Sequence, residues 1–554
     1  MYKFDYKRRK SCEVNIGGVR IGGSYPVAVQ SMTNTSTMDT DASVAQCCEI
    51  AAAGASIVRL TAQGVREAVN IGVIRDNLRR KSVTVPLVAD IHFNPKAAFA
   101  AAEVTDKVRI NPGNFVDPGR TFKKLTYTDA EYAEELKRID EVFGSFLDVC
   151  SLHGTAVRIG VNHGSLSDRI MSRYGDTPAG MVESAMEFLR VAQRRGFNDI
   201  VISIKASNVV VMVDTVRLLV ATMAAEDMAF PLHLGVTEAG DGEDGRVKSA
   251  VGIGCLLSEG IGDTIRVSLS ENPANEVPVA NELIEYIALC SAEHGLDEMF
   301  GKLPDVSFNS DAVCGVGGDN PTVIVHPMEL LLDNYIEAGS PEALLDAAFV
   351  DEIRKAPKKV VVLRPGNHVN VRGAVMAMAV KLRAEKINNP LIPRLTYCGN
   401  DGDKIAIHAA ADFGSLLLGG ITDGMWLDAP DMPRQWSMNL ALSILQAARI
   451  RFSKTEFIAC PGCGRTMFNL EQTLAAVKLA VGHLKDLKIG VMGCVVNGPG
   501  EMADADFGYV GAGVGRISLY KGRECVEKNI PQEEAIPRLI ALIKKSGRWH
   551  DPLR

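Results

Sequence analysis

Three cysteines near the end of the chain have the spacing of a metal centre. Cys460 and Cys463 form a CxxC turn after the strand-like run Phe457–Ala459, and Cys494 follows a second such run, Lys488–Met492. Each cysteine group stands beside glycines, where the backbone can turn closely around a bulky inorganic group. Because thiolates are the usual ligands of iron–sulfur clusters and of structural zinc, the pattern predicts one of these two centres.

Glu501 is our candidate for a fourth ligand. Three thiolates are one short of the usual set for a [4Fe–4S] cluster or a structural zinc ion, and Glu501 follows Cys494 after a Gly-Pro-Gly turn. A carboxylate binds a soft metal site more weakly than a thiolate, so an iron held in this way can exchange that ligand for a substrate oxygen. The alternative is a zinc site that Cys525 or Cys398 completes.

The amino-terminal half of the chain predicts the element that faces this centre. Short β-branched runs alternate with helical stretches over about the first 285 residues, which is typical of a parallel α/β domain. The predicted strands are Val27–Met32, Ser56–Leu60, Pro86–Asp90, Val108–Ile110, Ala156–Val161, Ile200–Ile204, Leu232–Val236 and Thr264–Leu269. Eight strand–helix units in this length fit a (β/α)8 barrel better than an open sheet. The segment Val14–Gly23 predicts a β-hairpin before the first strand.

Polar side chains follow the predicted strands at their carboxyl ends. Side chains alternate along a strand with a period of two, so Arg109 and Asn111 share one face. In a closed barrel this face lines the lumen at the carboxyl end, where barrel enzymes have their active sites. The cations expected to converge there are Arg59, Arg109, Arg158, Lys205 and Arg266.

Cations that converge in this way need an anion. Two like charges about 8 Å apart repel by roughly 2 kcal/mol at an effective dielectric constant near 20. A phosphate or diphosphate is the expected partner, because arginine offers bidentate donors to its oxygens. Alternatively, single cations pair with Asp90, Glu238 or Asp263 as ordinary salt bridges of a barrel. A metal site on Asp90 and His92 is a further alternative, which no other ligand cluster supports.

The region from about residue 287 to about residue 450 carries no chemical motif that we can name, but it repeats part of the barrel. Gly254–Asp263 and Gly414–Asp423 match at a constant offset of 160 positions. Where the first copy continues to Arg266, the second has Trp426, so the cation is absent. We expect a degenerate or partial barrel that serves as a spacer, and a chance similarity is the alternative. The predicted domains are therefore 1–286 for the barrel, 287–450 for the insert and 451–554 for the cluster domain.

Composition limits the classes of partner. The 554 residues carry a net charge of −7, which argues against a nucleic-acid or membrane surface. The basic amino-terminal segment is not followed by an apolar run, so we expect no signal peptide. The apolar stretch Val209–Ala225 contains Asp214 and Arg217 and predicts a barrel helix. Twelve cysteines without a secretion signal indicate a reducing compartment. The glycine-rich run Gly511–Gly515 precedes a strand-like segment and predicts hairpin turns, not a dinucleotide site.

Five segments together resemble a known family, that of 4-hydroxy-3-methylbut-2-en-1-yl diphosphate synthase. They are Val108–Asn114, Arg158–Ser165, Gly235–Gly240, Ala459–Gly464 and Gly493–Glu501, in the order in which the family has them. The insert makes the chain similar to the three-domain, plant-type form and unlike the shorter bacterial form. The missing transit peptide implies a bacterial cytoplasm.

The resemblance implies a fold and an activity. The fold is an N-terminal (β/α)8 TIM barrel, a central α/β insert that resembles a degenerate barrel, and a C-terminal α+β iron–sulfur domain. The activity is the reductive dehydration and ring opening of 2-C-methyl-D-erythritol 2,4-cyclodiphosphate to the allylic diphosphate. One [4Fe–4S] cluster per chain would take part, and reduced ferredoxin or flavodoxin would supply two electrons.

The resemblance also implies roles for single residues. The residues expected to bind the cyclic diphosphate or to support its binding are Arg59, Asp90, Arg109, Asn111, Arg158, Asn162, Lys205, Arg266 and Ser268. The cluster ligands are Cys460, Cys463, Cys494 and Glu501, and Glu238 is our candidate proton donor to the departing oxygen. The shorter family members are dimers in which each cluster domain caps the partner's barrel, so this chain is expected to be a homodimer or, with its spacer, a monomer.

Two other functions fit part of the pattern. The first is a barrel transferase that acts on a pterin or a sugar phosphate and carries a structural zinc site. The second is a sensor of a phosphate ligand with a redox-responsive cluster. The first leaves Glu501 and its glycine-rich turn without a task, and the second predicts binding without turnover.

Overall fold

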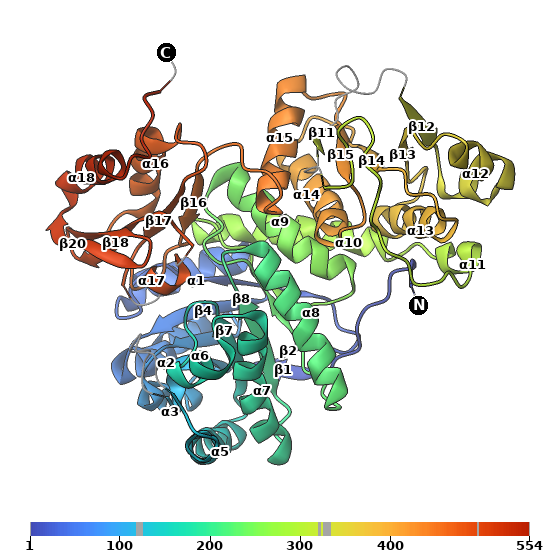
Figure 1. The fold of residues 1–554 in the computed structure, drawn as a ribbon. Helices are drawn as coiled ribbons and strands as arrows, with labels where there is room; N and C mark the ends of the chain where they lie inside the picture. Colours follow the sequence, from blue (N-terminus) through green and yellow to red (C-terminus); the bar gives the residue numbers. More distant parts are fainter. Residues whose placement is uncertain are drawn as a thin grey trace. The chain divides into compact units, whose positions relative to one another are not determined.

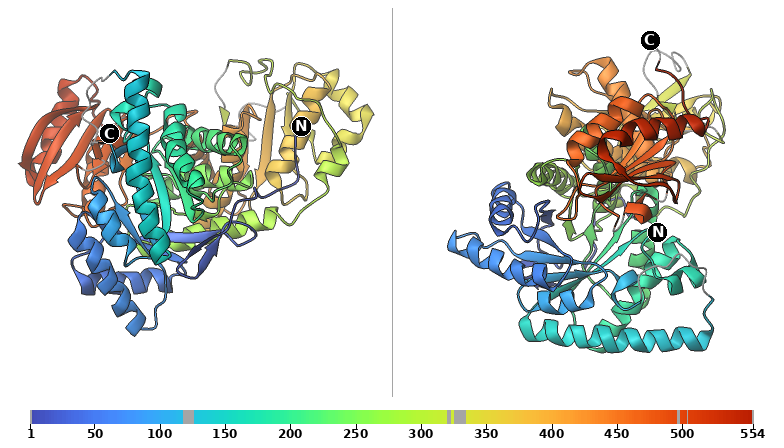
Figure 2. Two further views of the ribbon diagram at one scale, coloured as in Figure 1. Left: turned by 90° about the horizontal axis from the view of Figure 1, so that it is seen from below. Right: turned by 90° about the vertical axis from the view of Figure 1, so that its left-hand side faces the viewer.

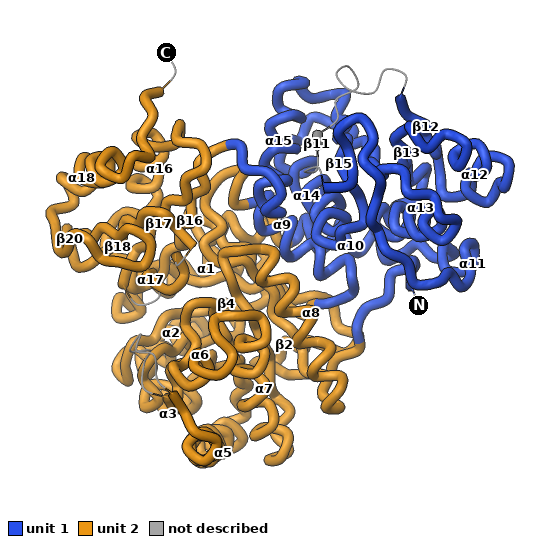
Figure 3. Tube along the Cα trace, in the orientation of Figure 1, with its two compact units in different colours: residues 1–9, 246–261, 281–453 blue, residues 10–245, 262–280, 454–554 orange. Residues whose placement is uncertain are grey.

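The computed structural model describes residues 2–117, 126–319, 323–324, 334–495, 498–502 and 504–552. Contacts divide the chain into two compact units, which Figure 3 colours separately. Unit 1 comprises residues 1–9, 246–261 and 281–453, and unit 2 comprises residues 10–245, 262–280 and 454–554. The barrel strands and the cysteine-containing domain thus belong to one unit, and the predicted division at residues 286 and 450 stays a prediction.

Eight parallel strands form a closed barrel in unit 2 (Figure 1). They are β3 (Ala28–Met32), β4 (Ile57–Ala62), β5 (Leu87–Ile91), β6 (Lys107–Ile110), β7 (Ala156–Asn162), β8 (Ile200–Lys205), β9 (His233–Leu234) and β10 (Thr264–Ile265). Neighbours pair in chain order from β3 to β8, and β10 pairs with both β3 and β9. A bridge between Ile202 and Leu232 closes the ring. All eight predicted strands are confirmed, although the last two are shorter than expected.

Helices follow the barrel strands along the chain. They are α1 (Thr40–Ala52), α2 (Val65–Arg80), α3 (Pro95–Ala102), α4 (Pro112–Phe115), α5 (Asp129–His153), α6 (Asp168–Tyr174), α7 (Pro178–Arg194), α8 (Val209–Ala225), α9 (Gly242–Ser258), the 3-10 turn η1 (Pro273–Asn275) and α10 (Glu276–Cys290). Figure 2 shows α5 on the outer side of the barrel strands. The apolar run predicted as a barrel helix is α8, and among the described residues no helix is long and apolar enough to cross a membrane.

The predicted hairpin closes the amino-terminal end of the barrel. β1 (Val14–Ile16) and β2 (Val19–Ile21) pair antiparallel. Ile16 and Ile21 are fully buried and pack in one cluster with residues near the amino-terminal ends of the barrel strands, such as Ile57. Because this end is filled by apolar side chains, polar chemistry is left to the carboxyl end.

The insert forms a parallel five-stranded sheet in unit 1, in the order β11-β15-β14-β13-β12. The strands are β11 (Val323–Ile324), β12 (Tyr335–Ala338), β13 (Val360–Leu363), β14 (Leu391–Thr396) and β15 (Gly424–Asp428). The helices are α11 (Leu296–Phe300), the 3-10 turn η2 (Pro341–Leu345), α12 (Ala347–Arg354), α13 (Val371–Ala384), α14 (Gly402–Leu418) and α15 (Arg434–Ala447). The first residues of β13, α14 and β15 lie 160 positions after those of β8, α9 and β10, so the repeat extends beyond the matching decapeptides.

The matching glycines of the repeat have one structural role. Within unit 1, a Cβ atom added to Gly254 would lie 2.7 Å from the Cβ of Ala411, and one added to Gly414 would lie 2.9 Å from the Cα of Val251. Real Cβ atoms do not approach this closely, so the two helix segments pack through their equivalent glycines. A shared packing role argues against a chance similarity.

The matching aspartates also share a role. Oδ2 of Asp263 accepts a hydrogen bond from the backbone N–H of Leu232 at 2.9 Å. Oδ2 of Asp423 accepts one from the backbone N–H of Leu391 at 2.8 Å. Each carboxylate therefore fixes the start of the strand that precedes it in the sheet, and the insert has kept this contact although Trp426 stands where the barrel has Arg266.

The C-terminal domain, which belongs to unit 2, has a mixed sheet in the order β16-β17-β18-β19-β20. The strands are β16 (Glu456–Ala459), β17 (Lys488–Met492), β18 (Phe507–Gly513), β19 (Arg516–Lys521) and β20 (Glu524–Pro531), and the helices are α16 (Leu470–Val481), α17 (Gly498–Glu501) and α18 (Gln532–Lys545). Helices α16 and α18 cover one face (Figure 1), where Leu474 and Leu539 are fully buried. The glycine-rich run lies in the antiparallel β18–β19 hairpin, as predicted.

Candidate active site

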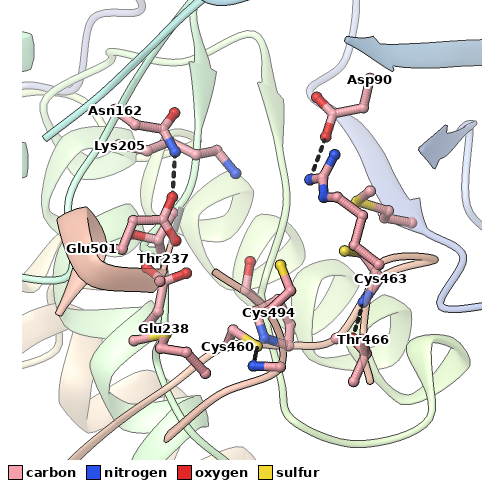
Figure 4. A pocket seen from close by; sticks show the side chains of 18 of the residues that line it. Asp90, Asn162, Lys205, Thr237, Glu238, Cys460, Cys463, Thr466, Cys494 and Glu501 are labelled. Carbon is pink, nitrogen blue, oxygen red and sulfur yellow. Dashed lines mark hydrogen bonds and ion pairs between the residues drawn. The ribbon is translucent and has the colours of Figure 1, made fainter. Parts of the chain in front are cut away.

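One cavity of about 100 Å³ in unit 2 is lined by the carboxyl ends of the barrel strands and by the two cysteine loops (Figure 4). The predicted site residues that line it are Arg59, Asp90, Arg109, Arg158, Asn162, Lys205, Glu238, Arg266, Ser268, Cys460, Cys463, Cys494 and Glu501. Asn111 is not among the lining residues: its Oδ1 accepts from the N–H of Gly113 at 3.1 Å and caps α4. The structure therefore brings the two predicted halves of the site together.

Two of the barrel cations have a carboxylate partner within 3.5 Å. Arg266 donates to both oxygens of Glu276, at 3.0 and 2.8 Å. Arg109 donates to Asp90 at 3.3 Å and also to the backbone oxygen of Gly160 at 2.9 Å. The salt-bridge interpretation thus holds for these two, although Glu276 was not predicted as a partner.

Arg158 has a different environment. It is 1% exposed, its Nη2 lies 3.9 Å from Asp90, and its Nε and Nη1 have no hydrogen-bond partner among the residues that the structure describes. Burial, together with the neighbouring cations Arg59 and Arg109, lowers the pKa of Arg158 well below its ordinary value. Burial and the same kind of repulsion lower the pKa of Lys205. A bound anion would offset the repulsion between these cations, which is one cause of the lowered pKa values. The carboxyl end of the barrel, which we call the mouth, therefore has the electrostatics of an anion site.

Asp90 is surrounded by cations. Burial would raise its pKa, but Arg59, Arg109, His92 and Arg465 hold the pKa well below its ordinary value. His92 contacts the guanidinium of Arg109, and burial followed by that charge lowers the pKa of His92. A neutral imidazole between guanidinium groups is a structural contact, and the described residues offer no group of three or more His, Cys, Asp or Glu side chains arranged around a single metal ion.

Glu238 and Glu501 lie next to each other on one side of the cavity (Figure 4). Nδ2 of Asn162 donates to Oε1 of Glu501 at 2.5 Å. Burial, and then the charge of Glu501, raises the pKa of Glu238 well above its ordinary value. The Glu238 backbone has a φ of 50°, in the left-handed region, which costs a side-chain-bearing residue about 1 kcal/mol or more. A strained, protonated carboxyl group at the end of a strand is suited to donate a proton.

The two cysteine loops leave the same edge of a parallel pair of strands. β16 and β17 pair with Ala459 opposite Val491, so Cys460 and Cys494 emerge at neighbouring strand ends. The backbone N–H of Gly493 donates to the sulfur of Cys460 at 3.2 Å. Parallel strands thus bring together cysteines that are far apart in the sequence.

Close backbone approach joins the Glu501 loop to the barrel. A Cβ atom on Gly164 would lie 2.3 Å from the carbonyl oxygen of Gly500, and one on Gly500 would lie 2.7 Å from that of Gly164. Only glycine fits at both positions. Ser207 donates to the backbone oxygen of Glu501 at 3.2 Å, and Ser270 donates to that of Cys460 at 2.9 Å. The loop that carries Glu501 therefore depends on the barrel for its position.

Comparison with known proteins gives the family. The model of the GcpE TIM-barrel domain matches residues 11–281, and the model of the GcpE protein C-terminal domain matches residues 456–545. The chain belongs to the GcpE family. The predicted resemblance is thereby confirmed.

GcpE relatives match along the whole chain. The 4-hydroxy-3-methylbut-2-en-1-yl diphosphate synthase (flavodoxin) of Phocaeicola vulgatus is 51% identical, with 99% of this chain and 99% of the relative covered. That of Bacteroides fragilis is 50% identical, with 99% of this chain and 97% of the relative covered. That of Protochlamydia amoebophila is 40% identical over 99% and 97%. The insert is therefore matched in full-length bacterial relatives too.

The residues of this GcpE family member fit a metal group larger than one ion. Cys460, Cys463 and Cys494 line one cavity, and none of them is in a disulfide. Burial raises the pKa of the Cys460 thiol, so its thiolate form needs a nearby positive charge of the kind that a metal group supplies. Glu501 lines the same cavity and adds an oxygen donor.

Sequence reasoning missed one cavity residue with a strong signal. Arg465 lines the cavity, its Nη2 is 3.7 Å from Asp90, and it stands two positions after Cys463. Burial would lower its pKa, but Cys463, Asp90, Cys494 and Glu501 raise it above the ordinary value. A cation this close to a cysteine motif, in an acidic chain, was the signal that could have found it.

Proposed function

We propose that this cavity is where the chain carries out the activity of its family, the synthesis of 4-hydroxy-3-methylbut-2-en-1-yl diphosphate in the methylerythritol phosphate pathway. The substrate is 2-C-methyl-D-erythritol 2,4-cyclodiphosphate, which is opened by two-electron reductive dehydration. The observation that carries this proposal is that the barrel cations and the three cysteines line the same cavity. If the diphosphate site and the site of the electron carrier served separate functions, they would not need to share one cavity.

The barrel mouth binds the diphosphate part of the substrate. Arg158 and Lys205 are buried cations whose pKa values are lowered by burial and by their neighbours, so the oxygens of a diphosphate stabilise both. Arg59 is similar, with a pKa lowered by burial to about 10. Arg109, Arg266 and Ser268 complete the predicted set. Asn111 stays a predicted member of this set, although its side-chain oxygen caps α4.

Cys460, Cys463, Cys494 and Glu501 hold one [4Fe–4S] cluster, which supplies the electrons that side chains cannot provide. Glu238 gives its proton to the oxygen that leaves as water, since its raised pKa keeps it protonated near neutral pH. Asn162 holds the carboxylate of Glu501 in place through the 2.5 Å hydrogen bond. Asp90 keeps Arg109 at the mouth.

The C-terminal domain excludes water from the mouth within a single chain, and we propose that the monomer is active. The barrel and the C-terminal domain belong to one unit, and Ala239 and Ala459 form a parallel bridge between them. The relatives are named with flavodoxin, so flavodoxin is the first electron donor to test and ferredoxin the second. A bacterial cytoplasm stays a prediction.

The proposal is tested by anaerobic turnover of the cyclic diphosphate with reduced flavodoxin, followed by mass spectrometry of the product and by iron and zinc analysis. We expect the allylic diphosphate to form and about four irons per chain. Stoichiometric zinc without product would favour the barrel transferase. Tight substrate binding to an iron-loaded chain without product would favour the sensor.

A further inference from the structure

Arg465 extends from the cysteine loop to the barrel. It is two residues past Cys463, yet it is only 7% exposed, and its Nη2 lies 3.7 Å from Oδ2 of Asp90 at β5. A long, flexible side chain loses conformational entropy when it is fixed in this way, so its position needs a compensating interaction. One carboxylate at 3.7 Å provides part of that interaction.

The guanidinium of Arg465 faces both signs of charge. The acidic side consists of Cys463, Cys494, Asp90 and Glu501, and the basic side includes Arg109. Among the described residues that line the cavity, Arg465 is the one cation that the C-terminal domain contributes; the other cations come from the barrel strands. Its charge is therefore fixed to the loop that carries the thiols.

Arg465 also has a hydrogen-bond donor that no described residue satisfies. Its Nε is buried and has no hydrogen-bond partner among the described residues. An unsatisfied buried donor costs about 1–3 kcal/mol, so a group that binds in the cavity is expected to face it. Asp90 is shared with Arg59, Arg109 and Arg158 and cannot neutralise Arg465 alone.

We infer that Arg465 is a positioning residue whose fixed charge stabilises the reduced state of the iron–sulfur cluster and ties the cysteine loop to Asp90. This inference rests on the proposed function, because it needs a cluster on that loop. Reduction adds one electron, and a buried cation nearby lowers the energy of the more negative state. Because this effect needs no substrate, it can be measured in the substrate-free enzyme.

The test is a redox titration followed by EPR, on the full-length, anaerobically purified chain without substrate. Arg465→Gln should make one-electron reduction about tenfold less favourable, which is a shift of 59 mV to lower potential. Arg465→Lys should keep most of the wild-type potential, since it keeps the charge. Arg523→Gln is the matched control: Arg523 is in the same domain, 57% exposed, and 3.9 Å from Asp176, so its removal should leave the potential unchanged.

Each outcome separates the inference from the proposed function. An unchanged potential in Arg465→Gln with full iron content overturns the inference and leaves the function standing. A wild-type chain without a reducible cluster overturns the proposed function itself. If Arg465→Gln does not assemble its cluster, Arg465→Met decides, because it keeps an apolar stem but removes the charge and should lower the potential in the same way. A potential that does not move in Arg465→Met then overturns the inference.

Discussion

The carboxyl edges of the barrel and of the insert come from the same series of elements, but their cations differ in their partners. In the insert, Arg394 donates to Asp428 at 2.7 Å, lies 3.2 Å from Glu337 and stacks on the ring of Trp426 at 4.3 Å. In the barrel, Nε and Nη1 of Arg158 are buried, and no described residue forms a hydrogen bond with them. Burying a cation without compensation is expensive, so the barrel mouth is built for an anion and the insert is not.

If cavity volume alone were used to locate the active site, the insert would be chosen and not the barrel. The cavity at the carboxyl edge of the insert has a volume of about 510 Å³, against about 100 Å³ for the barrel mouth. The larger cavity is lined by charged groups that already have partners, such as Lys404, whose Nζ is 3.2 Å from Glu282. Uncompensated charge, and not volume, distinguishes the proposed active site from the cavity of the insert.

The largest expected difference between the barrel and the insert is in the effect of a substitution on kcat. It concerns Glu238, which follows the seventh barrel strand. Glu238→Gln should lower kcat by roughly 100-fold to 10,000-fold with little change in KM, because it removes the proposed proton donor. Cys398, 160 positions later in the insert, is the matched control, and Cys398→Ser should leave kcat unchanged. Anaerobic steady-state kinetics measures both. An ordinary kcat in Glu238→Gln would remove this residue from the mechanism, and a loss of bound metal in Cys398→Ser would favour the zinc alternative.

The second prediction compares substrate binding by a cation of the barrel mouth, Arg158, with that by a cation of the insert cavity, Arg394. Arg158→Met should weaken binding of the cyclic diphosphate roughly 30-fold or more, because a buried charge-assisted contact is worth about 2–5 kcal/mol. Arg394→Met should bind the substrate as the wild type does. Calorimetric titration of the oxidised, unreactive enzyme measures both affinities. Equal losses in the two variants would contradict the assignment of the barrel mouth as the binding site.

The same pair of variants should have opposite effects on stability. Without ligand, Arg158→Met should leave the melting temperature unchanged or raise it, since a buried cation without a full set of partners is replaced by an apolar side chain. Arg394→Met should lower it by the equivalent of about 1 kcal/mol or less, because its carboxylate partners are partly exposed. A destabilised Arg158→Met protein would show that this cation already has sufficient partners.

The fourth prediction concerns the uptake of protons when an anion binds at the barrel mouth. Burial and neighbouring cations lower the pKa of Lys205 below 10.5 in the ligand-free mouth, and an anion raises it again. Binding of inorganic pyrophosphate should therefore take up protons at mildly alkaline pH, and its affinity should fall as pH rises through the lowered pKa. Calorimetry in two buffers with different ionisation enthalpies measures the uptake, with Lys205→Met as the variant that should reduce it. Proton release on binding would contradict the prediction.

The smallest expected effect on activity is that of replacing Asp412, a buried residue of the insert. Asp412 is buried and accepts hydrogen bonds from Tyr286 and Tyr397, and burial raises its pKa from 3.8 to about 7. Between pH 3.8 and about 7, the Asp412 carboxyl is mostly protonated in the folded state and mostly ionised in the unfolded state. The free energy of unfolding therefore falls as pH rises through this range. Asp412→Asn, which keeps an acceptor for both hydroxyls, should be more stable above pH 7 by roughly 4 kcal/mol at most.

Denaturant unfolding at about pH 5 and about pH 8 checks this prediction, with turnover measured in parallel. The variant should show a smaller pH dependence of unfolding and unchanged kcat/KM. The same pH dependence in both proteins would mean that Asp412 titrates normally. A change in turnover would contradict the comparison, because it would give the insert a part in the reaction.

Local patterns made the framework predictable. The eight barrel strands, the hairpin before them and the cysteine loops follow from β-branched runs and glycine positions that are readable within a few residues. The repeat at an offset of 160 positions was visible because Gly254 and Asp263 have packing roles that the copy has kept. Element ends were less predictable, since β9 and β10 end where polar side chains begin to face the cavity.

Contacts between distant residues were not predictable. Glu276 is the partner of Arg266, yet nothing near either residue in the sequence indicates that contact. The left-handed backbone of Glu238 is set by the surrounding structure and not by its residue type. Asn111 shares a strand face with Arg109 by alternation, but its side chain turns to cap α4, because a capping asparagine competes with any outward role.

The most direct test of the central claim is an EPR spectrum of the anaerobic, reduced enzyme with and without the cyclic diphosphate. The claim is that the barrel cations and the cysteine loops form one site for one substrate. We therefore expect a signal from about four irons per chain that changes shape when substrate is added, and that does not change in Arg158→Met at the same substrate concentration. A reducible cluster whose signal is the same with and without saturating substrate would contradict the account, because the substrate would then bind away from the cluster.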